Sequence, residues 1–175
     1  MRQNMKRHVL NTGYGLFLLI LACPLWACSY EEGRSYYRAK QYEKAYACFM
    51  QPENRQNPKA WNTLGIMYNN GYGVEKDERK AVEWYMKAAM NGYAVSQYNL
   101  ACQYEEGGGV ERNYTRALFW YEKAADNGEL LAMDRLGQIY SGGLCFQARD
   151  QEEARRWRER SFPIRRGWVS SPEKS

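Results

Sequence analysis

Few residues of this 175-residue chain are of the types that carry out catalysis. The only histidine, His8, lies in an N-terminal leader of residues 1–27. Without that leader the chain has no imidazole, which excludes Ser-His-Asp and Cys-His catalysis and every histidine-based metal site. Carboxylates alternate with basic residues, as in residues 75–80, so no two of them stand apart as an acid–base pair. We therefore expect no enzymatic activity, no cofactor and no metal ion.

Two glycine-rich segments, residues 71–73 and 107–109, raise the question of phosphate binding. A phosphate-binding loop follows a strand and is itself followed by Lys-Ser or Lys-Thr, and neither segment has these features. The two segments also occupy the same place in a repeating pattern, which is typical of a turn between helices. We interpret both as structural turns.

The five cysteines show no spacing that predicts redox or zinc chemistry. Cys23 lies in the leader, and the other four are Cys28, Cys48, Cys102 and Cys145. None has CxxC spacing, which argues against a zinc ribbon or a thioredoxin-type site. Separations of 20, 54 and 43 residues form no regular disulfide framework. We expect buried free cysteines that act as small hydrophobic side chains.

Residues 1–27 have the composition of a secretory signal peptide. Arg2, Lys6 and Arg7 precede an apolar run over residues 15–22, and the segment contains no acidic residue. The run is shorter than the roughly 20 residues that a membrane-spanning helix needs. Removing the leader lowers the formal charge from +5 to +2, which gives no support for nucleic-acid binding. We expect an exported protein.

The end of this leader resembles a bacterial lipobox. In such a motif, Leu25-Trp26-Ala27-Cys28 would be cut before Cys28, which becomes the acylated first residue. Trp26 is bulky where the motif normally carries a small or β-branched residue, so cleavage after Ala27 without lipid is the alternative. Ser29 after the cysteine resembles lipoproteins of the outer membrane. The resemblance implies a periplasmic protein that Cys28 tethers to the outer membrane.

The chain is similar to itself at an offset of 36 residues. Residues 59–92 match residues 95–128, and the pair Trp84-Tyr85 recurs as Trp120-Tyr121. The pattern continues weakly at residues 33–49 and 136–157. A fixed period of this length is the signature of a solenoid, in which each unit buries its apolar faces against its neighbours.

The sequence of each repeat predicts two helices. Trp61, Leu64 and Tyr68 recur at helical spacing, Asp77 is a candidate N-cap of the second helix, and Gly92 is a candidate C-cap. We predict an all-α, right-handed solenoid of about four helical hairpins over residues 28–162.

At this level of detail the repeats resemble a known family. Residues 59–92 and 95–128 are similar to the Sel-1-like repeat, a relative of the tetratricopeptide repeat, and residues 33–49 resemble a plain tetratricopeptide unit. The resemblance covers residues 29–161 and departs in the last unit, where Cys145-Phe146 replaces Gly-Val. It implies an α-solenoid that binds proteins and has no catalytic motif.

The resemblance also implies where a partner binds. In such solenoids the first helices of the hairpins line the concave face, and tyrosine and arginine are frequent at the centres of interfaces. We predict a polar and aromatic strip there, basic at one end and acidic at the other; the alternative is that its members are ordinary solvated residues. The predicted strip comprises Tyr30, Arg34, Tyr37, Arg38, Asn62, Ile66, Asn69, Asn70, Tyr98, Cys102, Glu105, Glu106, Asp134 and Gln138.

Residues 155–168 are basic and aromatic. Ala154, Trp157 and Ser161 fall on one side of a helix, which predicts a capping helix that Pro163 ends, followed by a basic, flexible tail over residues 163–175. Contact of residues 165, 166 and 168 with anionic lipid headgroups is the second possibility.

These features predict a non-catalytic scaffold or adaptor in the bacterial envelope that binds a protein or peptide on its concave face. An immunity protein that neutralises a toxin in the periplasm is the alternative. A hydrolase of the cysteine-rich secreted repeat type is more distant, because those relatives carry paired cysteines about eight residues apart in each repeat and this chain has none.

Overall fold

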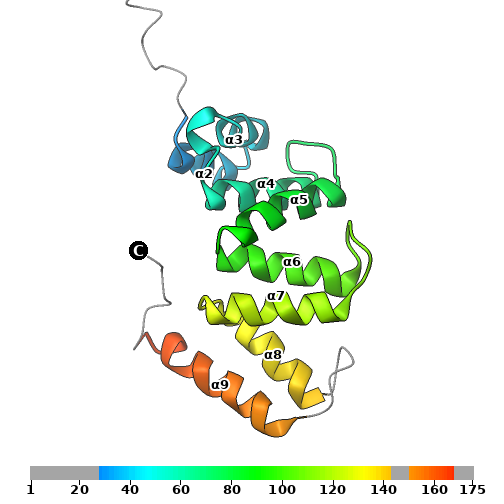
Figure 1. The fold of residues 1–175 in the computed structure, drawn as a ribbon. Coiled ribbons are helices and arrows are strands. Elements are labelled where there is room, and N and C mark those ends of the chain that lie inside the picture. The colour runs from blue at the N-terminus through cyan, green and yellow to red at the C-terminus, as the bar shows by residue number, and fades with distance from the viewer. Residues whose placement is uncertain (1–27, 143–149, 168–175) are drawn as a thin grey trace, which may run out of the picture.

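The computed structural model describes residues 28–142 and 150–167 (Figure 1). The predictions for the signal peptide, Cys145, Trp168 and the end of the tail therefore lie outside the described residues. Within those residues the secondary structure is helical. The helices are α2 (Tyr30–Arg38), α3 (Tyr42–Phe49), the short 3₁₀ helix η1 (Pro52–Asn54), α4 (Pro58–Asn70), α5 (Glu78–Met90), α6 (Ala94–Glu106), α7 (Tyr114–Asp126), α8 (Leu130–Gly142) and α9 (Gln151–Arg165).

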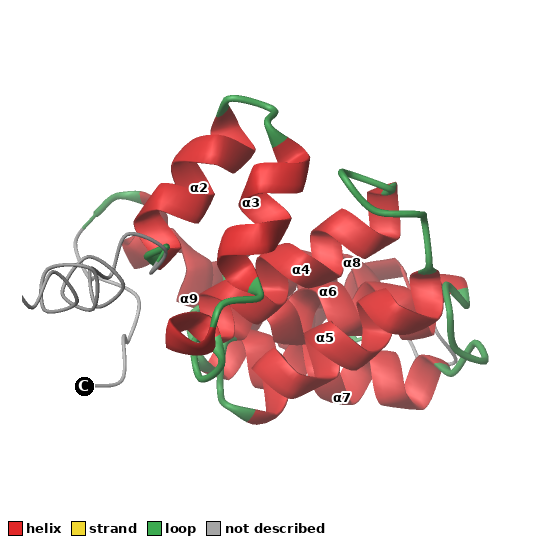
Figure 2. Cartoon of the chain, turned by 90° about the horizontal axis from the view of Figure 1, so that it is seen from above, coloured by secondary structure: helices red, strands yellow, loops and turns green. Residues whose placement is uncertain are grey.

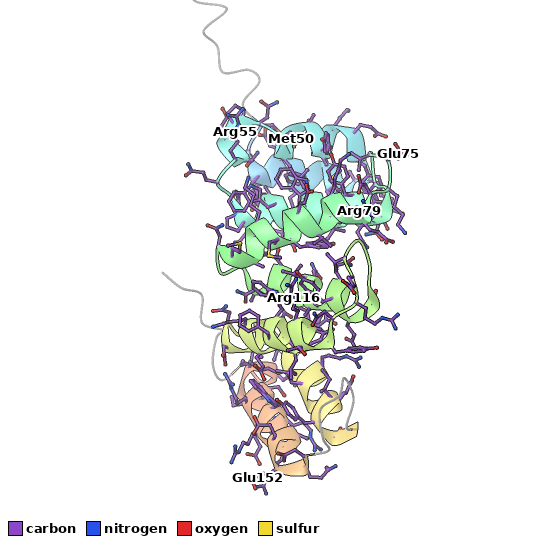
Figure 3. The ribbon with its side chains drawn as sticks, turned by 45° about the vertical axis from the view of Figure 1, so that its right-hand side comes forward. Met50, Arg55, Glu75, Arg79, Arg116 and Glu152 are labelled. Atoms are coloured by element: carbon purple, nitrogen blue, oxygen red, sulfur yellow. A yellow bond between two sulfur atoms is a disulfide. The ribbon has the colours of Figure 1, made fainter. Side chains whose placement is uncertain are left out.

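In the described part of the chain, eight α-helices form four antiparallel hairpins, α2/α3, α4/α5, α6/α7 and α8/α9, which stack in chain order (Figure 1). Figure 2 gives the same stack from above, with the short first hairpin next to the viewer. Met50 lies at one end of the stack and Glu152 at the other (Figure 3). This arrangement confirms the predicted all-α repeat solenoid.

Helix ends follow the local sequence. Ser29 and Glu32 form a capping box at the start of α2, in which the Glu32 backbone N–H donates to Ser29 Oγ over 3.2 Å. Asp77 caps α5 as predicted, accepting from the backbone N–H of Lys80 over 3.0 Å. Gly92 follows α5 with a φ of 80°, a conformation that glycine adopts without steric cost.

Small residues let the helices approach closely. The ring of Phe49 lies directly over Gly33 in the first hairpin, and the ring of Tyr85 lies over Gly65 in the second. Four alanines of the second helices are fully buried, namely Ala81, Ala88, Ala117 and Ala124. The core therefore consists of aromatic and aliphatic side chains packed against glycine and alanine positions.

The glycine-rich turns pack one hairpin onto the preceding one. A Cβ atom at Gly109 would lie 2.2 Å from the carbonyl oxygen of Glu78, at the start of α5. A Cβ atom at Gly73 would lie 2.7 Å from the carbonyl carbon of Tyr42, at the start of α3. Both glycines have a φ near +70°. The glycine-rich segments are turns between helices, as predicted, and they also pack against the preceding repeat.

The C-terminal helix is longer than predicted. Pro163 lies inside α9, which continues to Arg165. A proline so near a helix end removes only one backbone hydrogen bond. Ile164 packs against the core, and the Arg166 N–H closes the last turn by donating to the Phe162 carbonyl oxygen over 3.2 Å. The prediction that the tail starts at Pro163 is corrected accordingly.

The cysteines also differ from the prediction. Cys28 and Cys48 form a disulfide, so Cys48 is not a free thiol. Cys102 is free and partly buried, as expected. The spacing of the cysteines did not reveal the pair because the α2/α3 hairpin, rather than a sequence pattern, brings the two residues together. Lipidation of Cys28 stays a prediction, and it competes with this bond for the same sulfur.

No helix in the described part of the chain is long and apolar enough to span a bilayer. The same residues contain no cluster of three or more histidine, cysteine or acidic side chains suited to a metal ion.

Candidate functional site

Several members of the predicted strip join neighbouring hairpins. Asn62 is buried, and its side-chain oxygen accepts hydrogen bonds from Ser96 Oγ over 2.8 Å and Asn99 Nδ2 over 2.9 Å. Asn69 Oδ1 accepts from Gln103 Nε2 over 3.3 Å. These bonds tie α4 to α6, so the two asparagines are part of the contact between repeats.

Glu105 is the centre of a second network between repeats. It accepts a hydrogen bond from the Tyr121 hydroxyl over 2.6 Å and forms an ion pair with Arg135, whose Nε lies 3.2 Å from Glu105 Oε2. Arg135 also donates to Gln138 Oε1 over 3.0 Å. The Glu105 carboxylate raises the pKa of Arg135 by stabilising its charged form. The network links α6, α7 and α8.

Two further members of the strip, Tyr98 and Cys102, lie beside this network. The Tyr98 ring is 5.7 Å from the ring of Tyr121, centre to centre. Burial raises the pKa of Tyr98 to about 12, and it also raises the pKa of the Cys102 thiol. Cys102 is therefore protonated at neutral pH, the opposite of what an activated cysteine nucleophile requires.

Three more members of the strip also bond within the chain. Asp134 pairs with Arg165 of α9. Ile66 packs against the core, and the Asn70 side chain donates to the Ile66 carbonyl oxygen over 2.8 Å.

Two basic residues at the end of α9 also have partners within the chain. Arg165 forms the ion pair with Asp134, and the Arg166 guanidinium lies over the ring of Phe162 at 4.7 Å. Their predicted contact with lipid headgroups is not tested by these interactions.

The remaining members are more accessible. Tyr37 is half-buried and packs edge-on against Tyr42 and Tyr72, whose rings stack 4.7 Å apart. Burial raises the pKa of Tyr37. Arg38 and Glu106 are exposed at the ends of their helices. Whether these residues bind a partner stays a prediction.

A groove with a volume of about 610 Å³ crosses the starts of α2, α4 and α6 and reaches the residues just before α8. Tyr30 and Arg34 of the predicted strip line it, and Tyr30 packs against Phe49 with ring centres 5.8 Å apart. The other lining residues come from the segments before and within the first turns of these helices: Glu31, Asn57, Pro58, Lys59, Asn91, Gly92, Tyr93, Ala94, Val95, Asn127, Gly128 and Glu129. Polar, aromatic and oppositely charged side chains therefore share one surface.

The sequence prediction placed the binding residues along the helices and missed this groove. Of the strip, only Tyr30 and Arg34 reach it. The signal that could have revealed it is the recurring Asn-Gly pair at residues 91–92 and 127–128, because each pair joins one hairpin to the next and contributes to the lining.

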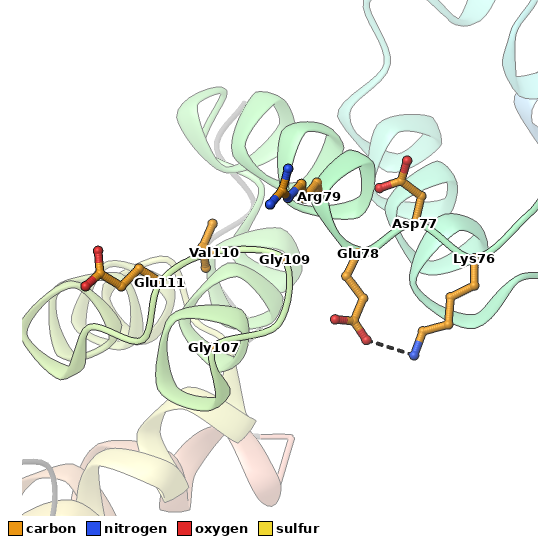
Figure 4. Close-up of a pocket in the computed structure, with 8 residues that line it drawn as sticks. All are labelled: Lys76, Asp77, Glu78, Arg79, Gly107, Gly109, Val110 and Glu111. Carbon is orange, nitrogen blue, oxygen red and sulfur yellow. Dashed lines mark ion pairs between the residues drawn. The ribbon is translucent and has the colours of Figure 1, made fainter.

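A second hollow of about 680 Å³ lies at the opposite ends of the first helices, where the glycine turns pack (Figure 4). It is lined by Lys76, Asp77, Glu78, Arg79, Gly107, Gly109, Val110 and Glu111. Lys76 Nζ and Glu78 Oε1 form an ion pair at 2.8 Å, and Asp77 is the N-cap of α5. Hydrogen bonding to the Lys80 backbone lowers the pKa of Asp77. Lys76 and Glu78 therefore pair with each other, and Asp77 pairs with Lys80.

Comparisons with known proteins agree with this architecture. The Sel1 repeat family model matches residues 62–93, 94–129 and 130–161, more than half of the chain. A Sel1 repeat protein from Oxalobacter formigenes is 37% identical over 76% of the chain, with a TM-score of 0.72. A protective antigen of uropathogenic Escherichia coli, c5321, which displays an SLR fold, is 32% identical over 76% of the chain, with a TM-score of 0.69.

The chain spans 54% of the first of these structures and 29% of the second. The search among curated proteins gives no match.

Proposed function

Because the chain belongs to the Sel1 repeat family, we propose that it is a non-catalytic binding module of the bacterial envelope that holds a segment of a partner protein. Sel1 repeat proteins generally mediate protein–protein interaction. The proposed export rests on the signal-like composition of residues 1–27, with the basic n-region, short apolar run and small residues near the cut site that such signals carry.

The observation that carries the proposal is the groove that crosses the starts of α2, α4 and α6 and reaches the residues just before α8. Solenoids bind partners on surfaces to which several repeats contribute, because each repeat adds a few side chains to one continuous site. Here the first three hairpins and the link between the third and the fourth contribute to the lining. The groove also contains two of the three kinds of side chain that most often anchor protein interfaces, namely tyrosine (Tyr30) and arginine (Arg34).

The polar networks favour this groove as the binding site over the predicted strip along the first helices. Asn62, Asn69 and Glu105 are engaged between repeats, so a partner would have to break those bonds to reach them. Arg34 and Lys59, in contrast, are exposed at the groove. The Arg34–Glu31 ion pair is long, at 3.5 Å, and solvent-exposed, so it is easily exchanged for a partner's carboxylate.

Affinity purification tests the proposal. The tagged full-length chain is recovered from detergent-solubilised envelopes at moderate salt, and the proteins that accompany it are identified by mass spectrometry. We expect a stoichiometric partner that the double variant Arg34→Glu, Lys59→Glu loses. The matched control, Lys76→Glu with Arg79→Glu, reverses two charges at the other ends of the helices and should retain it. Equal loss in both variants, or in neither, would contradict the groove assignment.

A further inference from the structure

We propose that Cys28, which pairs with Cys48 in a disulfide, carries no lipid in the folded protein. The inference rests on the proposed export, since disulfides persist in oxidising compartments outside the cytoplasm. The two residues are joined by a disulfide, and their Cα atoms are 5.0 Å apart, inside the usual range for such a bond. Cys48 belongs to α3, and Cys28 lies just before the start of α2.

The surroundings place the two cysteines together independently of the bond. The side chain of Asn54 is buried and donates from Nδ2 to the Cys28 carbonyl oxygen over 2.9 Å and to the Cys48 carbonyl oxygen over 2.8 Å. One amide therefore holds both backbones. Because an unpaired buried amide is costly, Asn54 is an anchor for this arrangement.

The next residue is fixed as well. The backbone N–H of Ser29 donates to Glu32 Oε2 over 2.8 Å, and Ser29 Oγ accepts from the Glu32 backbone N–H. Farther along α2, Gly33 packs under Phe49, the neighbour of Cys48. The chain that follows each cysteine is thus held in position, which lowers the entropic cost of forming the bond.

This arrangement conflicts with an acylated Cys28. A lipid thioether and the disulfide both require the Cys28 sulfur, so they exclude each other. An acylated Cys28 would leave the Cys48 thiol, only 5% exposed, without its partner. It would also hold α2 at the membrane surface, with the single residue Ser29 between the lipid and the helix.

The bond forms by thiol–disulfide exchange with an external protein disulfide. The two cysteine thiols lose two electrons and two protons, and the external disulfide is reduced to a dithiol. The product closes the first hairpin, whose helices have 9 and 8 residues against 13 in each helix of the next two hairpins. Because Tyr30 and Arg34 line the groove from this hairpin, the disulfide also secures one end of the proposed binding site.

Mass spectrometry of the chain, expressed with its own leader and alkylated before reduction, tests the inference. We expect peptides containing residues 28 and 48 to be linked, without acyl mass, while Cys102 is alkylated after denaturation. An acylated Cys28 together with an alkylated Cys48 would overturn the inference and leave the proposed export intact. A retained leader with both cysteines alkylated would instead contradict export, and the inference with it.

Limited proteolysis tests the structural role separately. The variants Cys28→Ser and Cys48→Ser should each be cut within the first hairpin about tenfold faster than the wild-type chain under non-reducing conditions. Cys102→Ser, which removes a cysteine outside the bond, is the matched control and should be cut at the wild-type rate. Unchanged cleavage in the first two variants would show that the bond does not hold the hairpin.

Discussion

Replacement of Gly65 by alanine tests whether close helix packing holds each hairpin. Gly65 is a buried residue of α4, and a Cβ atom there would lie 2.5 Å from Tyr85 Cε1 and 2.6 Å from Tyr85 Cδ1. Tyr85 is only 3% exposed, so its ring has no free space into which to move. The added methyl group must therefore push α4 and α5 apart.

The expected magnitude is the difference between two effects. Overpacking a buried site costs about 2–3 kcal/mol, and replacing glycine by alanine inside a helix returns about 1 kcal/mol. Gly65→Ala should therefore destabilise the chain by about 1–2 kcal/mol, which lowers the melting temperature by roughly 2–8 °C for a domain of this size. The third hairpin has Ala101 and Tyr121 at the positions equivalent to Gly65 and Tyr85. An alanine methyl group therefore fits at this position in a hairpin whose other side chains are packed around it.

Gly137 in α8 is the matched control. A Cβ atom there would meet Arg158 Cγ at 3.6 Å and the Ala154 carbonyl oxygen at 3.8 Å, which are ordinary contacts. Gly137→Ala should therefore stabilise the chain by about 0.5–1 kcal/mol through helix propensity alone. Thermal and urea unfolding followed by circular dichroism measure both variants. Equal stability changes of the same sign would refute the packing argument.

Three further predictions concern the turns, the disulfide and Tyr98. Gly109→Ala places a side chain against the Glu78 carbonyl, and the alanine must adopt the positive φ that Gly109 has. The left-handed conformation alone costs an alanine ~1–2 kcal/mol, so urea unfolding should show a loss of stability of at least that size. Reduction of the bond between Cys28 and Cys48 should lower the free energy of unfolding by ~3 kcal/mol, the chain-entropy value for a loop of this length, as measured by denaturation with and without reductant. The pKa of Tyr98 is raised to about 12 in the folded state, above the value of about 10 for a free tyrosine. The contribution of neutral Tyr98 to the free energy of unfolding should therefore be intact below pH 10 and lost as the pH rises to 12. Tyr98→Phe should make the alkaline unfolding curve shallower, and an unchanged curve would contradict this assignment.

The period of 36 residues was sufficient to predict the stacked hairpins, because glycine, alanine and aromatic positions recur where helices touch. Local signals also predicted the cap at Asp77, which depends only on its own helix. The prediction that the tail begins at Pro163 was wrong by a few residues, because the packing of Ile164 extends α9 past Pro163. Packing in this case overrides a local signal that usually ends a helix.

The candidate site was less predictable for a physical reason. Asn62 bonds to Ser96, and Glu105 bonds to Arg135, across 34 and 30 residues of sequence. A polar residue on a helix has the same appearance in the sequence whether it contacts solvent or a neighbouring repeat. The groove likewise forms only when segments of several repeats come together, so its lining cannot be read from any single repeat.

The most direct test of the account is the affinity of the purified chain for the partner that co-purifies with it. Titration calorimetry would compare the wild-type chain, the groove variant Arg34→Glu, Lys59→Glu and the control Lys76→Glu, Arg79→Glu. We predict at least a tenfold loss of affinity in the groove variant and less than a twofold change in the control. Wild-type affinity in the groove variant, with both proteins folded, would show that the partner binds elsewhere and would contradict the account.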